Sequence, residues 1–324
     1  MKKYLAVFIS LAFFYTNAQT KIIFTAIDYS RDEVRAAVCD SDGNNRTELG
    51  FNKTYLPIWF GNKILLNSDS FIWQCDSSGQ NLQKLFPGYR STVSTNKKLF
   101  AFYDSNGIAV ADENGRIIKQ IAVNVFEDAS ITWSNDDKKI SFFDPDKKRC
   151  FLFSLENDSL EIFGDLVFHP LWNPKNEIIL FNKALTDGKY AVIVKLKNGE
   201  EEIINQQNEN AVVPIWSHSG TKIAYLSFTT LIENSPESDL YPCDLVIYDF
   251  EKKKHQVLSS EASFTDKAFP QMCFDEKDEF LYFTKINDNN LGSLARVNLV
   301  TWQVEIISKD SFIDERFPQV KTFK

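Results

Sequence analysis

Several residue types are scarce in this sequence of 324 residues, and each scarcity excludes a class of protein. Two Met, 12 Gly and 10 Pro stand beside 28 Phe, 11 Tyr and 6 Trp, a composition typical of a strand-rich protein with a large core. Basic residues are outnumbered, since 36 Lys and Arg against 44 Asp and Glu give a net charge of -8. Nucleic acid and anionic membrane surfaces both attract a positive footprint, so we expect neither as a partner.

Residues suited to metal or nucleophilic chemistry are equally scarce. The three histidines are His169, His218 and His255, and each stands at a repeat position that other repeats fill differently. A metal centre needs several convergent ligands, and no G-x-S-x-G nucleophile motif occurs. We therefore expect no metal, no cofactor and no catalytic residue that the sequence alone can name.

The cysteines are odd in number and widely spread, and no two of them are spaced as C-x-x-C. They are Cys39, Cys75, Cys150, Cys243 and Cys273. We interpret them as buried free thiols, because a small hydrophobic side chain suits a buried strand. A disulfide framework or a metal site is the alternative interpretation.

Long apolar runs are missing after residue 20, where nothing approaches the roughly 20 residues of a membrane-spanning helix. The first residues, MKKYLAVFISLAFFYTNAQT, combine two lysines, an apolar run and small residues at Thr16 and Ala18. This pattern predicts a signal peptide over residues 1–18 and a single mature domain over residues 19–324. We expect an exported protein, periplasmic or secreted, without stable membrane insertion. An uncleaved anchor is the alternative.

A repeated phrase organises the rest of the chain. VPIWSHSGTKIAYLSF at residues 213–228 returns as HPLWNPKNEIILFNK at 169–183 and SITWSNDDKKISFFD at 130–144. Aligned on the aromatic residue, the phrase occurs seven times, at Trp59, Ser94, Trp133, Trp172, Trp216, Met272 and Val320. Pro57, Pro170, Pro214, Pro270 and Pro318 precede five of these positions by two residues. Each unit contains four short strands in about 40 residues, which is the pattern of a propeller blade.

The two ends of the chain together complete one blade. FPQVKTF at 317–323 matches a first strand, whereas residue 21 begins a second strand, KIIFTAI. A circular array has no open edge only when its first and last blades are joined. We therefore predict an all-β, seven-bladed propeller of four-stranded blades, whose first blade is closed by the N- and C-terminal strands.

The phrase P-x-W-S-x-x-G, followed by I-A-Y and a strand that ends in Asp, resembles the WD40-like propeller repeat of the TolB type. VPIWSHSGTKIAYLSF and DLVIYDF match that repeat best, and the resemblance covers about residues 21–324. It implies a propeller fold. Oligogalacturonate lyases use a propeller of this general kind with a His-rich metal site, and this sequence has no matching His cluster.

Physical roles follow for the repeated residues. The proline and tryptophan recur at one position, so we expect them to set the inner strand and to pack neighbouring blades rather than to stack a ligand. Asn135, Asp136, Ser219 and Gly220 suit tight turns, because Asx side chains bond the local backbone and Gly accepts a positive φ. Calcium binding at such acidic turns is the alternative.

Irregular loops indicate where a partner binds. The longest insertion, residues 229–243, lies between the second and third strands of the sixth blade, and the neighbouring interblade segments from Asn205 and Ser260 are also long. All three are expected on one face above blades five to seven. The candidate binding residues there are Glu209, Glu233, Glu237, Asp239, Tyr241, Glu261, Phe264 and Asp266. A solvated loop without a partner is the alternative.

Two functions from different classes remain open. The first is a non-enzymatic binding or scaffold module that presents this loop face to a protein or a carbohydrate, and the acidic content favours a cationic, carbohydrate or calcium-bridged partner. The second is a lyase or hydrolase of polysaccharides with acidic residues at the central channel. The enzyme requires two carboxylates, or a histidine and a carboxylate, converging at the channel mouth.

Overall fold

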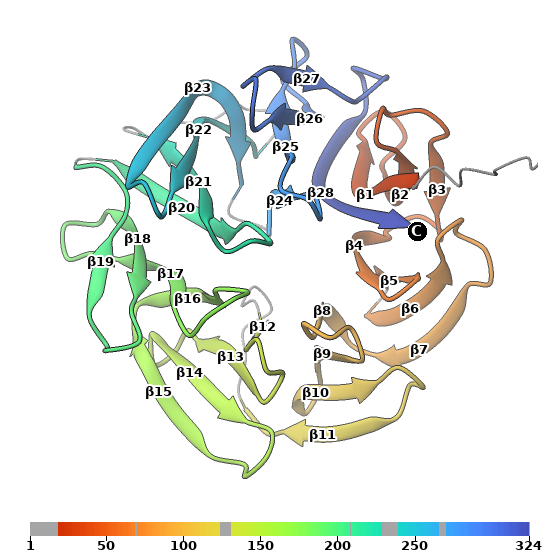
Figure 1. The fold of residues 1–324 in the computed structure, drawn as a ribbon. Coiled ribbons are helices and arrows are strands. Elements are labelled where there is room, and N and C mark those ends of the chain that lie inside the picture. Colours follow the sequence, from red (N-terminus) through yellow and green to blue (C-terminus); the bar gives the residue numbers. More distant parts are fainter. Residues whose placement is uncertain are drawn as a thin grey trace, which may run out of the picture.

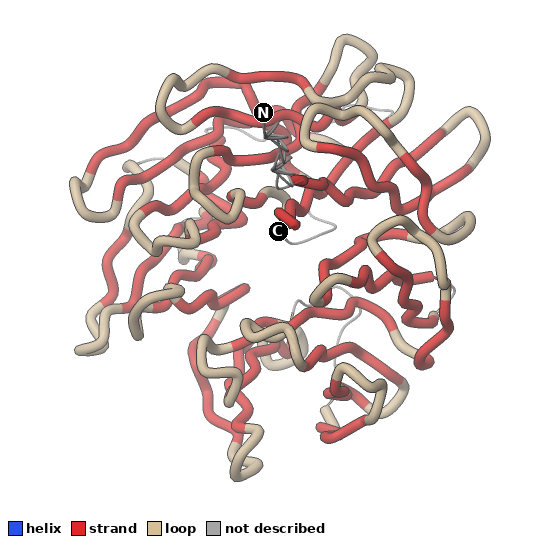
Figure 2. The backbone as a smooth tube through the Cα atoms, turned by 45° about the vertical axis from the view of Figure 1, so that its right-hand side comes forward, coloured by secondary structure: helices blue, strands red, loops and turns tan. Residues whose placement is uncertain are grey.

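The computed structural model describes residues 19–68, 70–123, 131–207, 209–228, 239–265 and 270–323. The predicted signal peptide over residues 1–18 lies outside these residues. Within them the chain forms strands and turns without a helix (Figure 2). The strands form seven four-stranded sheets that stand as blades around a central axis (Figure 1). The predicted all-β, seven-bladed propeller is confirmed.

Each blade is an antiparallel meander, and its strands run from the axis outward. Blade 1 contains β28 (Asp314–Phe323), β1 (Gln19–Asp28), β2 (Glu33–Asp40) and β3 (Thr47–Leu49). Blade 2 contains β4 (Tyr55–Phe60), β5 (Lys63–Ser68), β6 (Phe71–Asp76) and β7 (Gln83–Pro87). Blade 3 contains β8 (Tyr89–Val93), β9 (Leu99–Asp104), β10 (Gly107–Asp112) and β11 (Ile117–Ile121). Blade 4 contains β12 (Thr132–Trp133), β13 (Lys139–Asp144), β14 (Arg149–Ser154) and β15 (Leu160–Asp165).

The remaining three blades follow the same order. Blade 5 contains β16 (Val167–Trp172), β17 (Ile179–Ala184), β18 (Tyr190–Lys195) and β19 (Glu201–Ile203). Blade 6 contains β20 (Asn210–Trp216), β21 (Lys222–Phe228), β22 (Tyr241–Asp249) and β23 (Lys254–Phe264). Blade 7 contains β24 (Cys273–Phe274), β25 (Phe280–Ile286), β26 (Gly292–Asn298) and β27 (Val304–Ile306). Blade 1 joins both ends of the chain, as predicted, since Ile22 of β1 pairs with Val320 of β28.

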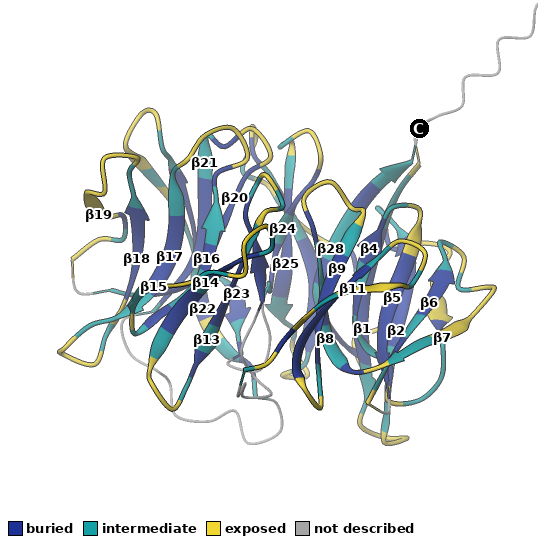
Figure 3. Cartoon of the chain, turned by 90° about the horizontal axis from the view of Figure 1, so that it is seen from below, coloured by how far each residue is buried: buried dark blue, intermediate teal, exposed yellow. Residues whose placement is uncertain are grey.

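The meander gives the ring two faces. The face that carries the turns between first and second strands, such as residues 217–221, is called the turn face here. The opposite face carries the connections between second and third strands, such as residues 29–32, and the crossings between blades. It is called the loop face. Buried residues concentrate in the strands and exposed residues at the two faces (Figure 3).

Inner strands share a bulge, and the signature proline lies in it. Leu56, His169, Val213 and Phe317 have φ values between +46° and +58°, and each is followed by proline. The register with the second strand shifts at this point in blades 1, 2, 5 and 6. Proline is tolerated there because a bulge needs no ladder hydrogen bond from it. Large side chains at positive φ are strained, so the surrounding structure must hold them.

Buried side chains on the second strands hold these bulges. The Leu56 amide donates to Thr25 Oγ1 at 3.0 Å. The Val213 amide donates to Asn182 Oδ1 at 2.8 Å, and Asn182 Nδ2 donates to the Ala211 carbonyl at 2.8 Å. In both cases the side chain belongs to the preceding blade, so the bonds that satisfy a bulge also fix two neighbouring blades to each other.

On the turn face, a second set of hydrogen bonds joins neighbouring blades. The carboxylate of Asp278 in blade 7 accepts from the amides of His218 and Ser219 in blade 6, at 2.8 and 2.7 Å. Asp137 in blade 4 bonds the turn of blade 3 in the same way. Gly220 has a φ of +72°, and its carbonyl accepts from Asn173 Nδ2 of blade 5 at 2.8 Å.

Strand pairing corrects two of the seven predicted aromatic positions. In blade 4, Trp133 pairs with Ile140 of the second strand, and the amide of the following residue bonds across the turn that joins the two strands. The residue with the same pairing and the same turn bond is Val93 in blade 3 and Phe274 in blade 7, whereas Ser94 and Met272 were predicted. Pro270 therefore stands four residues before the aromatic position and is not equivalent to the other prolines. Blade 3 has neither the proline nor the tryptophan, and blade 7 has Pro270 without a tryptophan, so the sequence pattern of these blades fitted more than one register.

Three of the four repeated tryptophans lie where neighbouring blades meet. Trp59, Trp133 and Trp216 are buried, whereas Trp172 is half-buried at the channel wall. The Trp216 indole donates to the Leu171 carbonyl of blade 5 at 3.2 Å. All five cysteines are free thiols.

Candidate functional site

The structure describes five of the eight predicted binding residues, whereas Glu233, Glu237 and Asp266 lie outside the described residues. Glu209 precedes β20 on the loop face. Tyr241, Glu261 and Phe264 are in strands, because β22 and β23 extend until Tyr241 pairs with Phe264. The expectation of a loop beginning at Ser260 is therefore wrong for its first five residues.

Two of the predicted acids form ion pairs between blades. Glu261 of β23 pairs with Lys285 of β25, which joins blades 6 and 7. Asp239 lies just before β22 and pairs with Arg316 of blade 1, with 2.5 Å between Oδ1 and Nη1. The charges of both carboxylates are neutralised by basic side chains of the protein itself. They would therefore attract a cationic partner less strongly than the acidic composition of the loops indicates.

Arg316 is the centre of a buried network that sequence reasoning missed. Its side chain is 3% exposed, and Asp314 beside it is 0% exposed. Arg316 Nε and Nη2 donate to the two oxygens of Asp314, at 2.7 and 2.5 Å. Such a bidentate pair fixes both planes. The Gly292 amide of blade 7 donates to the same carboxylate at 3.0 Å, so blades 6, 7 and 1 meet at one point.

Tyr29 connects this network to the surface. Its hydroxyl donates to Asp314 Oδ2 at 3.0 Å and accepts from Arg316 Nη2 at 3.2 Å, while the residue is 50% exposed. Burial of the hydroxyl, and then the Asp314 charge, raise the pKa of Tyr29 to about 12. Burial alone lowers the pKa of Arg316, but the bonds to Asp314 and Asp239 outweigh it and raise that pKa. The phenol and the guanidinium both keep their protons throughout the physiological range.

A cleft of about 850 Å³ opens beside Tyr29, between blades 7 and 1 on the loop face. One wall is the β1–β2 hairpin, with Tyr29 and Arg31, and the other is the crossing from β27 to β28, with Phe312. Its volume lies in the range of small-molecule sites. Nothing in the sequence indicated this cleft, because the binding face was predicted from long loops and both of these connections are short.

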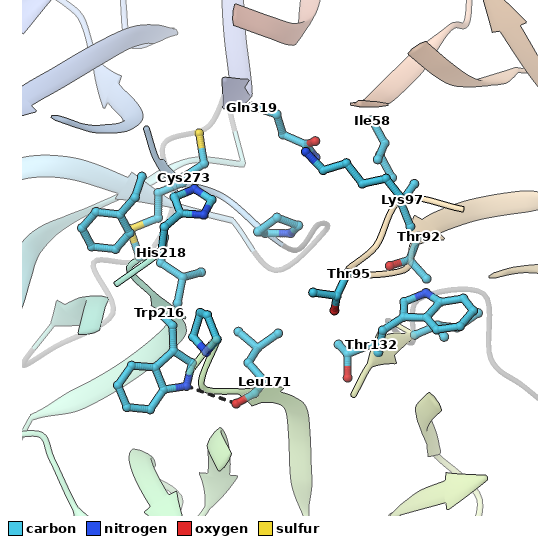
Figure 4. Close-up of a pocket in the computed structure, with 18 of the residues that line it drawn as sticks. Ile58, Thr92, Thr95, Lys97, Thr132, Leu171, Trp216, His218, Cys273 and Gln319 are labelled. Carbon is cyan, nitrogen blue, oxygen red and sulfur yellow. Dashed lines mark hydrogen bonds between the residues drawn. The ribbon is translucent and has the colours of Figure 1, made fainter. Parts of the chain in front are cut away.

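A second cavity, of about 690 Å³, occupies the central channel. Its walls are mainly the inner strands, with tryptophans, aliphatic side chains and hydroxyls from several blades. Trp216 and His218 lie on one side and Thr95 and Lys97 on the other (Figure 4). The channel is therefore wide enough for a ligand and mostly apolar.

The channel offers little that resembles a catalytic pair. Among the described residues that line it, Glu276 is the one carboxylate and His218 the one histidine, and His218 bonds a carboxylate, that of Asp278, through its backbone amide. His169 lies at the bulge of β16, where burial, and then the charge of Arg90, lower its pKa to about 4. Across the described ranges, no group of three His, Cys, Asp or Glu side chains is arranged to hold a metal ion.

Comparison with known proteins shows a likeness of fold. No protein-family model matches this sequence, and no curated protein matches it in sequence. In the described part of the chain, no helix is long and apolar enough to span a membrane.

Several solved structures share the architecture at low sequence identity. A TolB from Agrobacterium tumefaciens is 15% identical, with a TM-score of 0.51 over 76% of this chain and 91% of its own. An oligogalacturonate lyase from Vibrio parahaemolyticus is 14% identical, with a TM-score of 0.56 over 90% and 86%. A puromycin-hydrolyzing peptidase from Mycobacterium tuberculosis is 14% identical, with a TM-score of 0.61 over 86% of this chain but only 50% of its own.

The strand topology and the similar solved structures together define the fold class. The chain forms a seven-bladed β-propeller, and its fold is similar to that of a TolB from Agrobacterium tumefaciens. The same fold occurs in a lyase and in part of a peptidase, so its function has to be argued from its own residues.

Proposed function

We propose that this chain is an exported, non-enzymatic binding module that presents its loop face to a protein or a glycan. The observation that carries the proposal is the Arg316 network, which holds the loop-face ends of blades 6, 7 and 1 in one rigid arrangement beside an open cleft. Loops fixed on a rigid scaffold are the usual place for recognition in such folds. Export is supported by the sequence of residues 1–18.

The alternative is a propeller enzyme that acts on a polysaccharide. It is supported by the likeness of fold to an oligogalacturonate lyase. It requires two carboxylates, or a histidine and a carboxylate, that converge at the channel mouth. The described lining supplies one carboxylate, Glu276, and one histidine, His218, and His218 bonds a carboxylate, that of Asp278, through its backbone amide and not through its ring. The binding module needs no such pair, so we favour it.

Capture from envelope extract tests the proposal. The baits are the full chain, a loop variant in which residues 230–237 are replaced by a Gly-Ser linker, and a control variant with the same replacement at residues 197–200 on the turn face. The loop replacement stops before Asp239, because Asp239 pairs with Arg316 and Leu240 is 1% exposed. We expect the full chain and the control to capture the same partner and the loop variant to lose it, at equal melting temperatures. Equal capture by all three, or capture by none, contradicts the proposal.

A further inference from the structure

The cleft between blades 7 and 1 has the chemistry of a sugar site. From its lining, we infer that it binds a neutral oligosaccharide through the exposed rings of Tyr29 and Phe312. This inference depends on the proposed function and deepens it, because it selects a glycan from the two classes of partner and places it at a defined cleft.

Exposed aromatic rings are rare on this protein and gather here. Three aromatic side chains stand out as exposed among the described residues: Tyr29 at 50%, Tyr190 at 40% and Phe312 at 73%. Two of them line the one cleft. Sugar rings present flat C–H faces that pack on aromatic rings, while a scattered exposed aromatic would need no explanation.

Phe312 is held in place although its side chain is exposed. The carbonyl of Ser311 accepts from Asn287 Nδ2 at 3.1 Å and from Asn289 Nδ2 at 2.9 Å. The Phe312 amide donates to Asp310 Oδ1 at 2.9 Å. Opposite, Tyr29 is anchored by its hydroxyl to Asp314 and Arg316. The Tyr29 side chain and the backbone that carries Phe312 are therefore ordered before any ligand arrives, which lowers the entropic cost of binding.

Most of the charged side chains that line the cleft are paired with one another. Arg35 pairs with Glu33 at 3.1 Å and with Glu48 at 3.3 Å. Arg46 pairs with Glu48 at 3.6 Å and with the buried Glu315 at 3.0 Å. An anionic or cationic ligand would have to break these pairs, whereas a neutral ligand would not.

The hairpin wall completes the set of polar groups. Asp28 accepts from the Ser30 amide at 3.0 Å and the Ser30 hydroxyl at 2.6 Å, which orders the turn that carries Arg31. The Arg31 side chain is 74% exposed and lies 3.5 Å from Asp28. The walls of the cleft thus carry both hydrogen-bond donors, which are guanidinium and amide groups, and hydrogen-bond acceptors, which are carboxylates. Hydroxyl groups do both, so a hydroxyl-rich neutral ligand can use either kind of wall.

Calorimetric titration of the full chain with defined hexasaccharides tests this. The neutral probes are cellohexaose, xylohexaose, maltohexaose and mannohexaose, and the charged probes are hexagalacturonate and chitosan hexamer. We expect at least one neutral probe to bind, with an affinity that changes little between low and high salt, because exposed charges contribute little to the complex. Binding of charged probes alone, or of no probe, overturns the inference.

Variants locate the site. Phe312→Ala is expected to weaken binding of the neutral probe about tenfold or more, and Arg31→Gln to weaken it by a smaller factor. Val300→Ala is the matched control, because Val300 is 81% exposed on the same blade at the turn face. All three side chains are exposed, so the variants should melt at the same temperature as the parent chain. Unchanged affinity in Phe312→Ala overturns the cleft as the site.

The two proposals fail separately. If no neutral hexasaccharide binds but the full chain still captures a partner that the loop variant loses, the inference falls and the proposed function stands. If no sugar binds and no partner is captured through the loop face, both fall.

Discussion

Arg316 shows how one residue can hold several blades. Its guanidinium bonds Asp314 in its own strand, Asp239 in blade 6 and Tyr29 in the turn between β1 and β2. Asp314 is fully buried, so it depends on this arginine for its charge to be tolerated. The acids that the composition suggested for a partner are, at this point, part of the scaffold.

Removing the arginine should therefore be costly. Arg316→Ala leaves Asp314 as an uncompensated buried charge, and we expect the free energy of unfolding to fall by about 3–5 kcal/mol in urea denaturation. Asp239→Asn should cost much less, since Asp239 is partly exposed and the bidentate pair with Asp314 remains. A stability of Arg316→Ala within about 0.5 kcal/mol of the parent would show that the network is not needed.

The lowered pKa of His169 predicts how the stability of the protein depends on pH. Burial lowers its pKa from 6.5 to about 4 in the folded chain, so the unfolded chain binds more protons between these values. The contribution of His169 to stability is complete above about pH 6.5 and is lost as the pH falls toward 4, by at most about 3 kcal/mol. Urea midpoints of His169→Gln should fall less over this window than those of the parent. Parallel pH profiles would count against a buried neutral imidazole.

The recurring element is a blade whose bonds reach its neighbour. On the turn face, Asp278 and Asp137 each accept two amides from the turn of the preceding blade. Thr25 and Asn182, on second strands, each bond the strained bulge in the inner strand of the following blade. The strands of one blade could form alone, but the bulges and turns are satisfied only when the blades stand side by side.

Asp278 offers a test at this scale. Asp278→Ala removes two charge-assisted bonds and places alanine at a φ of +57°. We expect a loss of about 1–2 kcal/mol and faster hydrogen exchange at the amides of His218 and Ser219. Asp278→Asn is the control, because asparagine tolerates this φ and keeps one acceptor. Unchanged exchange at both amides in the alanine variant would contradict the interlock.

The whole molecule is a closed ring, and blade 1 is where it closes. β28 pairs with β1 from Gln19 opposite Phe323 to Ile27 opposite Asp314. The strand also carries Arg316, so the closure of the ring and the order of the loop face depend on one segment. An open ring would expose the edge of β1 to other chains.

Deleting residues 314–324 should therefore abolish the cooperative fold and give a chain that aggregates. A circular permutant should keep the fold, because the two ends are antiparallel partners. It joins Phe323 to Gln19 through a short turn and opens the chain at Gly199, which is an exposed glycine with open space around it. Thermal unfolding and size-exclusion chromatography distinguish the outcomes. A monomeric, cooperatively folded deletion chain would show that closure is not required.

What the sequence determined by itself is the architecture. Seven repeats with alternating apolar residues, and termini that complete one blade, predicted the ring and its closure, because the alternation and the turn residues are local properties of each strand. Local pattern failed where it was weak. Val93 and Phe274, rather than Ser94 and Met272, take the aromatic position, since both blades lack the tryptophan, blade 3 also lacks the proline, and Pro270 of blade 7 is not at the equivalent place.

Only the tertiary structure revealed the buried network and the cleft on which the two proposals rest. Asp239 and Arg316 are 77 residues apart in sequence, and Tyr29 is 287 residues from Arg316, so no local pattern reveals their bonds. The cleft beside Phe312 is made of two short segments that ring closure brings together. Contacts of this kind depend on how whole blades lie next to one another. A local sequence pattern does not contain that information, because the blades take their positions only when the ring has folded.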